Sequence, residues 1–458
     1  MKKGILQIIL GNIIYLLIST LINLVLPKFM TLESYAVLKT YILYINYAGL
    51  FHLGIIDGIY LKYGGKDISE VQKSECKTDL TGLILLSLFF AFIILGMGFM
   101  ASSEILMAYS IGIISFNTLG FFKNFYSAVG LFGKYSWILS CEIIVVFFCY
   151  LLLIYIGIDD NAIPYIANRV AVLCILCLFC YFSLELHKVN INEIKNVIEN
   201  IVDNIKQGIL LMLGNFATVC FSGIDRWVVL LFINKRAFAI YAFAVSMEQI
   251  VNAFISPVTL SMYNYLCKYT DYHRIKVIKN LVTCWGFLLI ILGFPTQYIV
   301  NMYLPKYKEA IGLIFVLFAA MAIHTVIKGV YLNIYKIERK QKVYFKQMIT
   351  MLVIAVLLDL AFYGIFRNMI SIAIATFIVS LIWLIICEFK DRRLRYGIKE
   401  ILAIVALSCM YLFCGTMGNP FLGFCFYLVS FVLIVSLLMK DARHIFFEYI
   451  FSVLRIKK

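Results

Sequence analysis

Charged side chains are scarce in this 458-residue sequence. Asp, Glu, Lys and Arg together make up 14% of it, whereas hydrophobic residues make up 63%. A soluble globular domain has about 25% charged and about 45–50% apolar residues. A soluble fold of this length could not bury so much apolar surface, and the excess requires a lipid bilayer as its solvent. The composition therefore excludes a soluble enzyme, a disordered regulator and a small disulfide-stabilised domain.

Motifs of several functional classes are also missing. No G-x-x-x-x-G-K-[ST] loop for nucleotide phosphates occurs, since the nearest run, residues 130–135, has the wrong spacing and lacks the hydroxyl. No H-E-x-x-H pair and no Cys/His quartet indicates a metal site. The thirteen cysteines lie mostly inside apolar runs, where thiols pack as small hydrophobes. We therefore expect no nucleotide-driven motor, no catalytic residues and no cofactor, and only coupling to H⁺ or Na⁺ stays open.

Long apolar runs fill most of the chain. A helix needs about 20 mainly apolar residues to cross the hydrocarbon of a bilayer. The first run follows two lysines and is too long for the core of a signal peptide, so we interpret it as a span. We expect an all-helical protein with fourteen spans, near residues 5–26, 35–60, 80–100, 105–129, 138–158, 163–184, 209–232, 238–263, 281–300, 310–335, 347–366, 369–387, 400–415 and 420–439.

Basic residues alternate sharply between the two sides of these spans. The loops and termini on the side of the N-terminus contain 29 Lys and Arg residues, whereas those on the opposite side contain 6. Short cytoplasmic loops carry such an excess, so we expect both termini in the cytoplasm. The net charge of +15 is therefore explained by membrane topology, and we expect no nucleic-acid partner.

One loop is long enough to form its own helix. Residues 185–206 place five isoleucines at steps of three and four, which indicates an amphipathic linker helix on the cytoplasmic surface. We expect an N-lobe over residues 1–184, a C-lobe over 207–395, two extra spans over 396–439 and a cytoplasmic tail over 440–458.

Short matches in order indicate an internal duplication. Lys123 and Tyr126 in the fourth span recur as Lys328 and Tyr331 in the tenth, and other matches lie 203 to 206 residues apart. Because each unit has six spans, both copies share one orientation. We expect two six-helix lobes with pseudo-two-fold symmetry along the membrane normal and a substrate cavity between them.

Several short segments resemble a known family. They are Gly11-Asn12 in the first span, the run 53–58 at the end of the second, Ile224-Asp225-Arg226, and Tyr241-Ala242. In these segments and in its span count the chain resembles the polysaccharide-repeat flippases of the multidrug/oligosaccharidyl-lipid/polysaccharide exporter superfamily.

The resemblance implies a function and a location. It implies movement of an undecaprenyl-diphosphate-linked oligosaccharide repeat unit from the inner to the outer leaflet of a bacterial cytoplasmic membrane. The product would serve assembly of a surface polysaccharide such as O-antigen, capsule or exopolysaccharide. It also implies a glycan polymerase and a chain-length regulator as partners.

Five cations lie inside the expected spans: Lys39, Lys123, Arg169, Arg226 and Lys328. Ionisable residues in a span are costly and are candidates for function by default. A diphosphate is bound by ammonium and guanidinium groups, so we assign these five to the diphosphate or sugar. The alternatives are snorkelling toward the membrane surface and, for Arg226, an internal ion pair with Asp225.

Buried acidic and imidazole groups are the candidates for ion coupling: Asp57, Asp225, Glu248, His324 and Asp359. A carboxylate at membrane depth can take up a proton or bind Na⁺. The alternative is a purely structural pairing with a nearby cation or helix amide.

Three other functions remain open. Two share the fold, a flippase for a lipid-linked peptidoglycan precursor and a drug/ion antiporter, although the several cations disfavour the latter because drug antiporters usually carry cationic compounds. The third is a membrane glycan polymerase, which generally needs a sizeable external loop or a cytosolic catalytic domain that this chain lacks.

Overall fold

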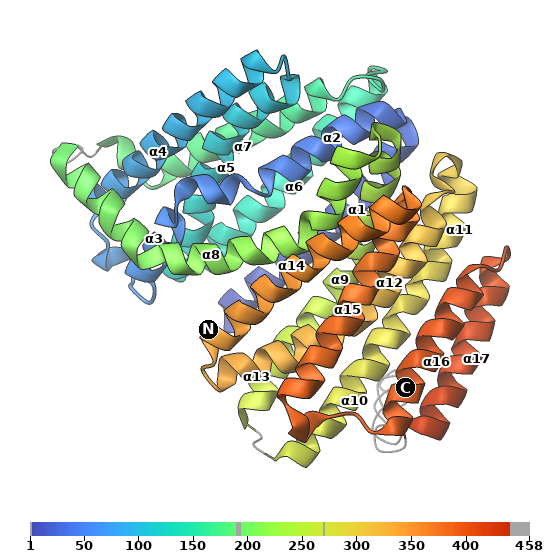
Figure 1. The fold of residues 1–458 in the computed structure, drawn as a ribbon. Helices are drawn as coiled ribbons and strands as arrows, with labels where there is room; N and C mark the ends of the chain where they lie inside the picture. The colour runs from blue at the N-terminus through green and yellow to red at the C-terminus, as the bar shows by residue number, and fades with distance from the viewer. Residues whose placement is uncertain (1, 189–193, 269–270, 440–458) are drawn as a thin grey trace. The chain divides into compact units, whose positions relative to one another are not determined.

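The computed structural model describes residues 2–188, 194–268 and 271–439, and all regular secondary structure in these ranges is helical (Figure 1). In this part of the chain, thirteen helices are long and apolar enough to cross a membrane, or fourteen when one bent pair counts as a single span. The expected all-helical architecture with about fourteen spans is confirmed.

Residue contacts divide the chain into two compact units, Met1–Gly223 and Ile224–Lys458. The helices of the first unit are α1 (Lys2–Phe29), α2 (Leu32–Ile45), α3 (Ile55–Tyr63), α4 (Lys73–Met100), α5 (Glu104–Ala128), α6 (Phe132–Tyr155) and α7 (Ile163–Ser183). Helix α8 (Ile194–Phe232) runs from the first unit into the second. The second unit continues with α9 (Lys235–Lys268), α10 (Tyr272–Leu289), α11 (Gly293–Tyr303), α12 (Ala310–Val326), α13 (Leu332–Ile337), α14 (Gln341–Phe366), α15 (Met369–Lys390), α16 (Ile398–Gly415) and α17 (Pro420–Leu438).

Each unit is built around one central helix. In the first unit α5 packs against α2, α3, α4 and α7, and it is more buried than the other candidate spans there. In the second unit α12 packs against α9, α10, α15 and α16 and is likewise the most buried. Helix α5 corresponds to the fourth expected span, which carries Lys123. Helix α12 forms the first part of the tenth expected span, which carries Lys328.

The surfaces of both units carry large apolar side chains. Phe92 on α4, Leu210 on α8, Leu357 on α14 and Phe421 on α17 are all more than half exposed. Contiguous apolar surface on this scale is not stable in water and fits contact with lipid chains. The chain is therefore a multi-pass membrane protein.

The second expected span is not one helix. Residues 35–60 contain a break, where α2 and the short η1 helix (Ala48–His52) end and α3 begins at a bend of 64°. Leu53 and Gly54 both have positive φ, 48° and 91°, which an α-helix cannot accommodate. His52 Nδ1 accepts a hydrogen bond of 3.1 Å from the Gly54 amide and closes the turn.

The expected linker helix and the seventh span form one continuous helix, α8. Its described first turns pack on the first unit with Val197 and Asn204 buried, and the Asn204 amide donates to Asp79 Oδ1 at 3.0 Å. Residues 189–193 and the tail 440–458 lie outside the described residues. The lobe boundaries and the surface position of the linker stay predictions.

Helix α8 crosses α3 at backbone contact. A Cβ on Gly208 would overlap the carbonyl oxygen of Gly54 and the amide nitrogen of Gly58, and a Cβ on Gly58 would overlap the backbone of Asn204. Gly54 and Gly58 are four residues apart, so they form a flat face on which a second helix can lie closely.

We predict that Gly208→Ala lowers the melting temperature of the purified protein, because the added methyl must push α8 away from α3. Overpacking of this kind costs about 1–3 kcal/mol. Gly214→Ala in the same helix is the matched control, since a Cβ there meets nothing within 4 Å. Equal melting temperatures for the two variants would contradict the close crossing.

Candidate functional site

An ion pair joins α5 and α6 in the first unit. Lys123 Nζ lies 2.5 Å from Glu142 Oε2, and the two side chains are 24% and 11% exposed. Arg169 on α7 interacts electrostatically with the same carboxylate and with the hydroxyls of Tyr41 and Tyr150. Lys123 and Arg169, both predicted to bind substrate, therefore share one counter-ion.

The other two candidates of the first unit lie elsewhere. Lys39 donates a hydrogen bond of 3.0 Å to Asn23 Oδ1 on α1, and its ammonium lies 5.2 Å from the centre of the Tyr35 ring. Asp57 follows the break in the second span, and its Oδ1 accepts a hydrogen bond of 3.2 Å from Asn215 on α8.

A second charged group forms around the start of the second unit. Asp225 is 8% exposed, and its Oδ2 accepts a hydrogen bond of 2.8 Å from the Tyr241 hydroxyl on α9. The other oxygen, Oδ1, accepts the amide of Arg226 at 2.7 Å and lies 3.9 Å from Arg226 Nε. The expected internal ion pair of Asp225 and Arg226 is present, in a long geometry.

The same group extends along α9 to the end of α12. Glu248 interacts electrostatically with Asp225, Arg226 and Lys328, and Lys328 in turn interacts with His324. The His324 ring lies one turn before Lys328, and its Nε2 is 3.0 Å from Ser380 Oγ on α15.

Lys328 occupies an irregular stretch of its helix. Residues Ile327–Tyr331 form a single π-helical turn, η6, between α12 and α13. Within this turn Lys328 is exposed, while Ile327 and Gly329 on either side are buried. π-Helical turns are rare and occur frequently at functional sites, because the extra residue changes the direction of a side chain.

Asp359 on α14 is the least solvated member of this group. It is 1% exposed, and neither carboxylate oxygen has a hydrogen-bond partner within the described part of the chain. It interacts electrostatically with Asp225. An isolated carboxylate at this depth is too costly to remain ionised, so it requires a proton or a bound cation. No group of three or more His, Cys, Asp or Glu residues that could hold a metal is found in the described ranges.

The two groups differ in sign. The first unit brings together two cations, Lys123 and Arg169, with the carboxylate of Glu142. In the second unit Arg226 and Lys328 meet the three acidic side chains Asp225, Glu248 and Asp359, with His324 at the edge. The structure therefore places four of the five predicted cations in two groups of opposite charge balance, and Lys39 in neither.

Sequence reasoning missed three buried ionic residues, Glu142, Asp79 and Lys279, and the partly exposed Glu388. Glu142 lies within the expected fifth span, and the rule that membrane-embedded charges are candidates would have identified it. Asp79, Lys279 and Glu388 were assigned to loops because they lie one or two residues outside the expected spans, whereas α4, α10 and α15 extend past them.

Two of these residues, Lys279 and Glu388, form an ion pair in the second unit, near the ends of their helices. Lys279 Nζ lies 2.9 Å from Glu388 Oε1 and also donates to the carbonyl oxygen of Leu394. The other Glu388 oxygen accepts the Tyr396 amide at 2.6 Å.

In the first unit Asp79 Oδ2 accepts hydrogen bonds from Lys62 at 2.8 Å and from the Tyr63 hydroxyl at 2.7 Å. Lys62, one of the 29 basic residues counted on the side of the N-terminus, is thus part of a packed polar network.

We predict strong coupling between Lys123 and Glu142 in a double-mutant cycle. Lys123→Met or Glu142→Leu alone leaves a partly buried charge without its partner, which should cost about 2 kcal/mol, between the values for exposed and fully buried pairs. The double variant replaces both charges with apolar groups and should regain most of the loss. Thermal unfolding in detergent measures the three variants.

The exposed pair Lys206–Asp203 is the control for this cycle. Its atoms are 3.9 Å apart and both side chains are more than half exposed, so Asp203→Asn should change stability by less than about 0.5 kcal/mol. Additive effects of the two substitutions at 123 and 142 would show that the ion pair has no energetic role.

No family model and no curated protein matches the sequence. Among solved structures the fold is similar to that of the lipid II flippase MurJ in an inward closed conformation, with 14% sequence identity, a TM-score of 0.65, and coverage of 96% of this chain and 99% of that chain. Weaker likenesses include MATE in complex with Br-NRF, at 12% identity and a TM-score of 0.46, with coverage of 89% of this chain and 96% of that chain. They also include a MOP superfamily transporter from Pyrococcus furiosus, at 13% identity and a TM-score of 0.41, with the same two coverages. At these identities the comparison with MurJ establishes a shared fold.

Proposed function

We propose that this protein is a flippase that moves an undecaprenyl-diphosphate-linked oligosaccharide repeat unit from the inner to the outer leaflet. The glycan would feed a surface polysaccharide such as O-antigen, capsule or exopolysaccharide. We further propose that the protein works by alternating access and does not change its substrate covalently.

One observation carries the proposal. The central helix of the first unit bears Lys123, the π-helical turn that continues the central helix of the second bears Lys328, and each lysine has an arginine within its charged group. Cations are retained at membrane depth only where they have an anionic partner, and a diphosphate is such a partner. The candidate binding groups lie within the spans, and the loops between spans are short. This arrangement favours a transporter over a membrane glycan polymerase.

The shared fold supports a lipid-linked substrate. The solved structure with TM-score 0.65 is that of a lipid II flippase, and lipid-linked precursors share a polyprenyl chain and a diphosphate. The same likeness favours a second candidate, a flippase for a lipid-linked peptidoglycan precursor. The two candidates differ in the sugar and require the same cationic groups.

We propose the bacterial cytoplasmic membrane as the location, with both termini in the cytoplasm, as the distribution of basic residues predicts. A glycan polymerase and a chain-length regulator are the proposed partners.

The test of function removes the two lysines. We predict that Lys328→Met, and separately the double variant Lys123→Met with Glu142→Leu, abolish transfer of a lipid-diphosphate oligosaccharide across proteoliposomes. In cells the precursor should accumulate in the inner leaflet. The double variant removes the cation without leaving an unpaired carboxylate, and its melting curve shows whether the protein still folds when Arg169 has lost Glu142.

Lys342→Met on α14 is the matched control, since this lysine is exposed and outside both charged groups. Normal transfer by both test variants would overturn the assignment of the binding cations. A precursor that reaches the outer leaflet but fails to lengthen would instead indicate the polymerase. Transfer of lipid II alone would select the second candidate, and export of cationic drugs without lipid transfer would select the antiporter.

We also propose that the acidic group of the second unit binds the coupling cation. Asp359 and Asp225 interact electrostatically, and Asp359 lacks a hydrogen-bond partner in the described residues. Na⁺ is a hard cation that prefers carboxylate and hydroxyl oxygens, and both are present in Asp359, Asp225 and Tyr241. A proton shared by the two carboxylates is the alternative occupant.

We predict that Na⁺ raises the melting temperature of the wild-type protein relative to choline at equal ionic strength, because a ligand that binds only the folded state stabilises it. Asp359→Asn should abolish this difference, and the exposed substitution Asp203→Asn should preserve it. Equal sodium shifts in Asp359→Asn and wild type would contradict the site. A shift that depends on pH and not on Na⁺ would assign the site to protons.

A further inference from the structure

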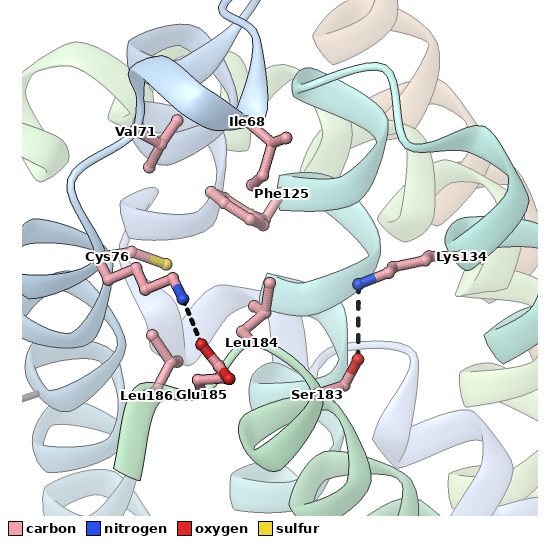
Figure 2. A pocket seen from close by; sticks show the side chains of 10 residues that line it. Ile68, Val71, Cys76, Phe125, Lys134, Ser183, Leu184, Glu185 and Leu186 are labelled. Atoms are coloured by element: carbon pink, nitrogen blue, oxygen red, sulfur yellow. Dashed lines mark hydrogen bonds and ion pairs between the residues drawn. The ribbon is translucent and has the colours of Figure 1, made fainter. Parts of the chain in front are cut away.

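The first unit contains a cavity of about 200 Å³ at the ends of its spans. It is formed where α4 and α6 begin and where α5 and α7 end. Figure 2 shows Ile68, Val71 and Phe125 on one side of the cavity and Ser183, Leu184 and Glu185 on the other. Because four spans end here, the cavity lies at the level of the membrane surface.

The cavity combines an apolar floor with basic groups. Phe125, Cys76 and Leu186 line it and are at most 2% exposed. Lys73 and Lys134 contribute the basic lining. The ammonium of Lys134 lies 3.4 Å from the hydroxyl of Ser183 (Figure 2) and 5.5 Å from the centre of the Tyr126 ring, and no ion pair of this lysine is found in the described residues. Such a lining suits a ligand with one anionic end and one apolar end.

Glu185 adds a negative charge to the lining of the cavity. Glu185 lies 2.7 Å from Lys73 and 2.8 Å from Lys188. Hydrogen bonds from Lys188 and Lys73 lower the pKa of the Glu185 carboxyl to about 2, so it stays ionised at physiological pH. Glu185 has a φ of 56°, which is uncommon for a residue other than glycine and fixes its position in the turn after α7. Two lysines therefore pair with one carboxylate, and Lys134 adds a further positive charge to the lining.

We propose that this cavity binds the phosphate of an anionic phospholipid headgroup. Lys73 and Lys134 would be the ligands of the phosphate, and the apolar floor would contact the start of the acyl chains. The phosphate would take the place of the long Ser183 contact at Lys134 and share Lys73 with Glu185. The cavity volume of about 200 Å³ admits a phosphate with its ester oxygens.

A phospholipid fits this place better than a free phosphate ion. Half of the cavity wall is aliphatic or aromatic, and an inorganic ion would gain nothing from it, whereas a lipid brings apolar carbon to that surface. Basic residues at the membrane surface also meet a high local concentration of anionic lipid. The proposal does not depend on which substrate the protein transports.

The test measures lipid binding by the full-length protein. We predict that phosphatidylglycerol, added to the protein in detergent, raises its melting temperature more than phosphatidylcholine does. Native mass spectrometry should show retained phosphatidylglycerol, and the double variant Lys73→Ala with Lys134→Ala should weaken its apparent affinity about tenfold. Lys73→Arg with Lys134→Arg should restore binding because it keeps both charges.

Lys342→Ala with Lys346→Ala is the matched control. It removes the same charge from exposed positions on α14, which belongs to the second unit and does not line the cavity, and should bind phosphatidylglycerol like wild type. A lipid-free melting curve shows whether each variant is folded. Equal losses in the test and control variants would reduce the effect to general surface charge and overturn the site. Saturation by inorganic phosphate alone, with no added effect of phosphatidylglycerol, would overturn the lipid as its occupant.

Discussion

The low dielectric of the bilayer controls where this chain can place a charge, and each unit supplies partners for most of its membrane-embedded charges. Lys123 lies on the most buried helix of the first unit and remains there because Glu142 is 2.5 Å away on α6. Asp225 is tolerated because Tyr241 and the Arg226 amide satisfy its oxygens. Without these partners the desolvation of each charge would not be offset and would destabilise the fold by several kcal/mol. In the proposed function, a diphosphate would replace Glu142 as the partner of Lys123, and a cation would bind beside Asp225.

Close backbone packing holds the helices that carry these charges. Gly54, Gly58 and Gly208 let α3 and α8 meet without side chains between them, and Asn204 then reaches Asp79. Helix–helix association in lipid gains little from the hydrophobic effect, so such close contacts and buried hydrogen bonds replace it. The break at Leu53 and Gly54 belongs to the same arrangement, because it turns α3 so that its glycine face meets α8.

Hydropathy predicted the helical architecture because every backbone group in a bilayer must find its partner within its own helix. The rule that charges inside a span are candidates for function selected ten residues. In the structure nine of them are buried or partly exposed, and Lys328 is exposed. Hydropathy could not locate the break at Leu53, since composition does not change there, and the π-turn at Lys328 has no sequence signal either. Asp79, Lys279 and Glu388 were missed for a different reason. Helices extend beyond the apolar run that predicts them, and charges at the end of a span become buried when neighbouring helices cover them.

The opposite charge balance of the two units has a mechanistic consequence for the proposed function. The first unit places two cations near Glu142, whereas the second places three acidic groups near Arg226 and Lys328. In the proposed function the first group would accept an anion and the second a cation. If the two halves arose by the duplication that the sequence predicts, both copies kept a lysine on the central helix or its continuation and diverged in their carboxylates, which would suit two ligands of opposite sign. Coupling then requires only that occupancy of one site alters the helix packing on which the other depends. The carboxylates, and not the repeated lysines, would therefore distinguish the substrate unit from the coupling unit.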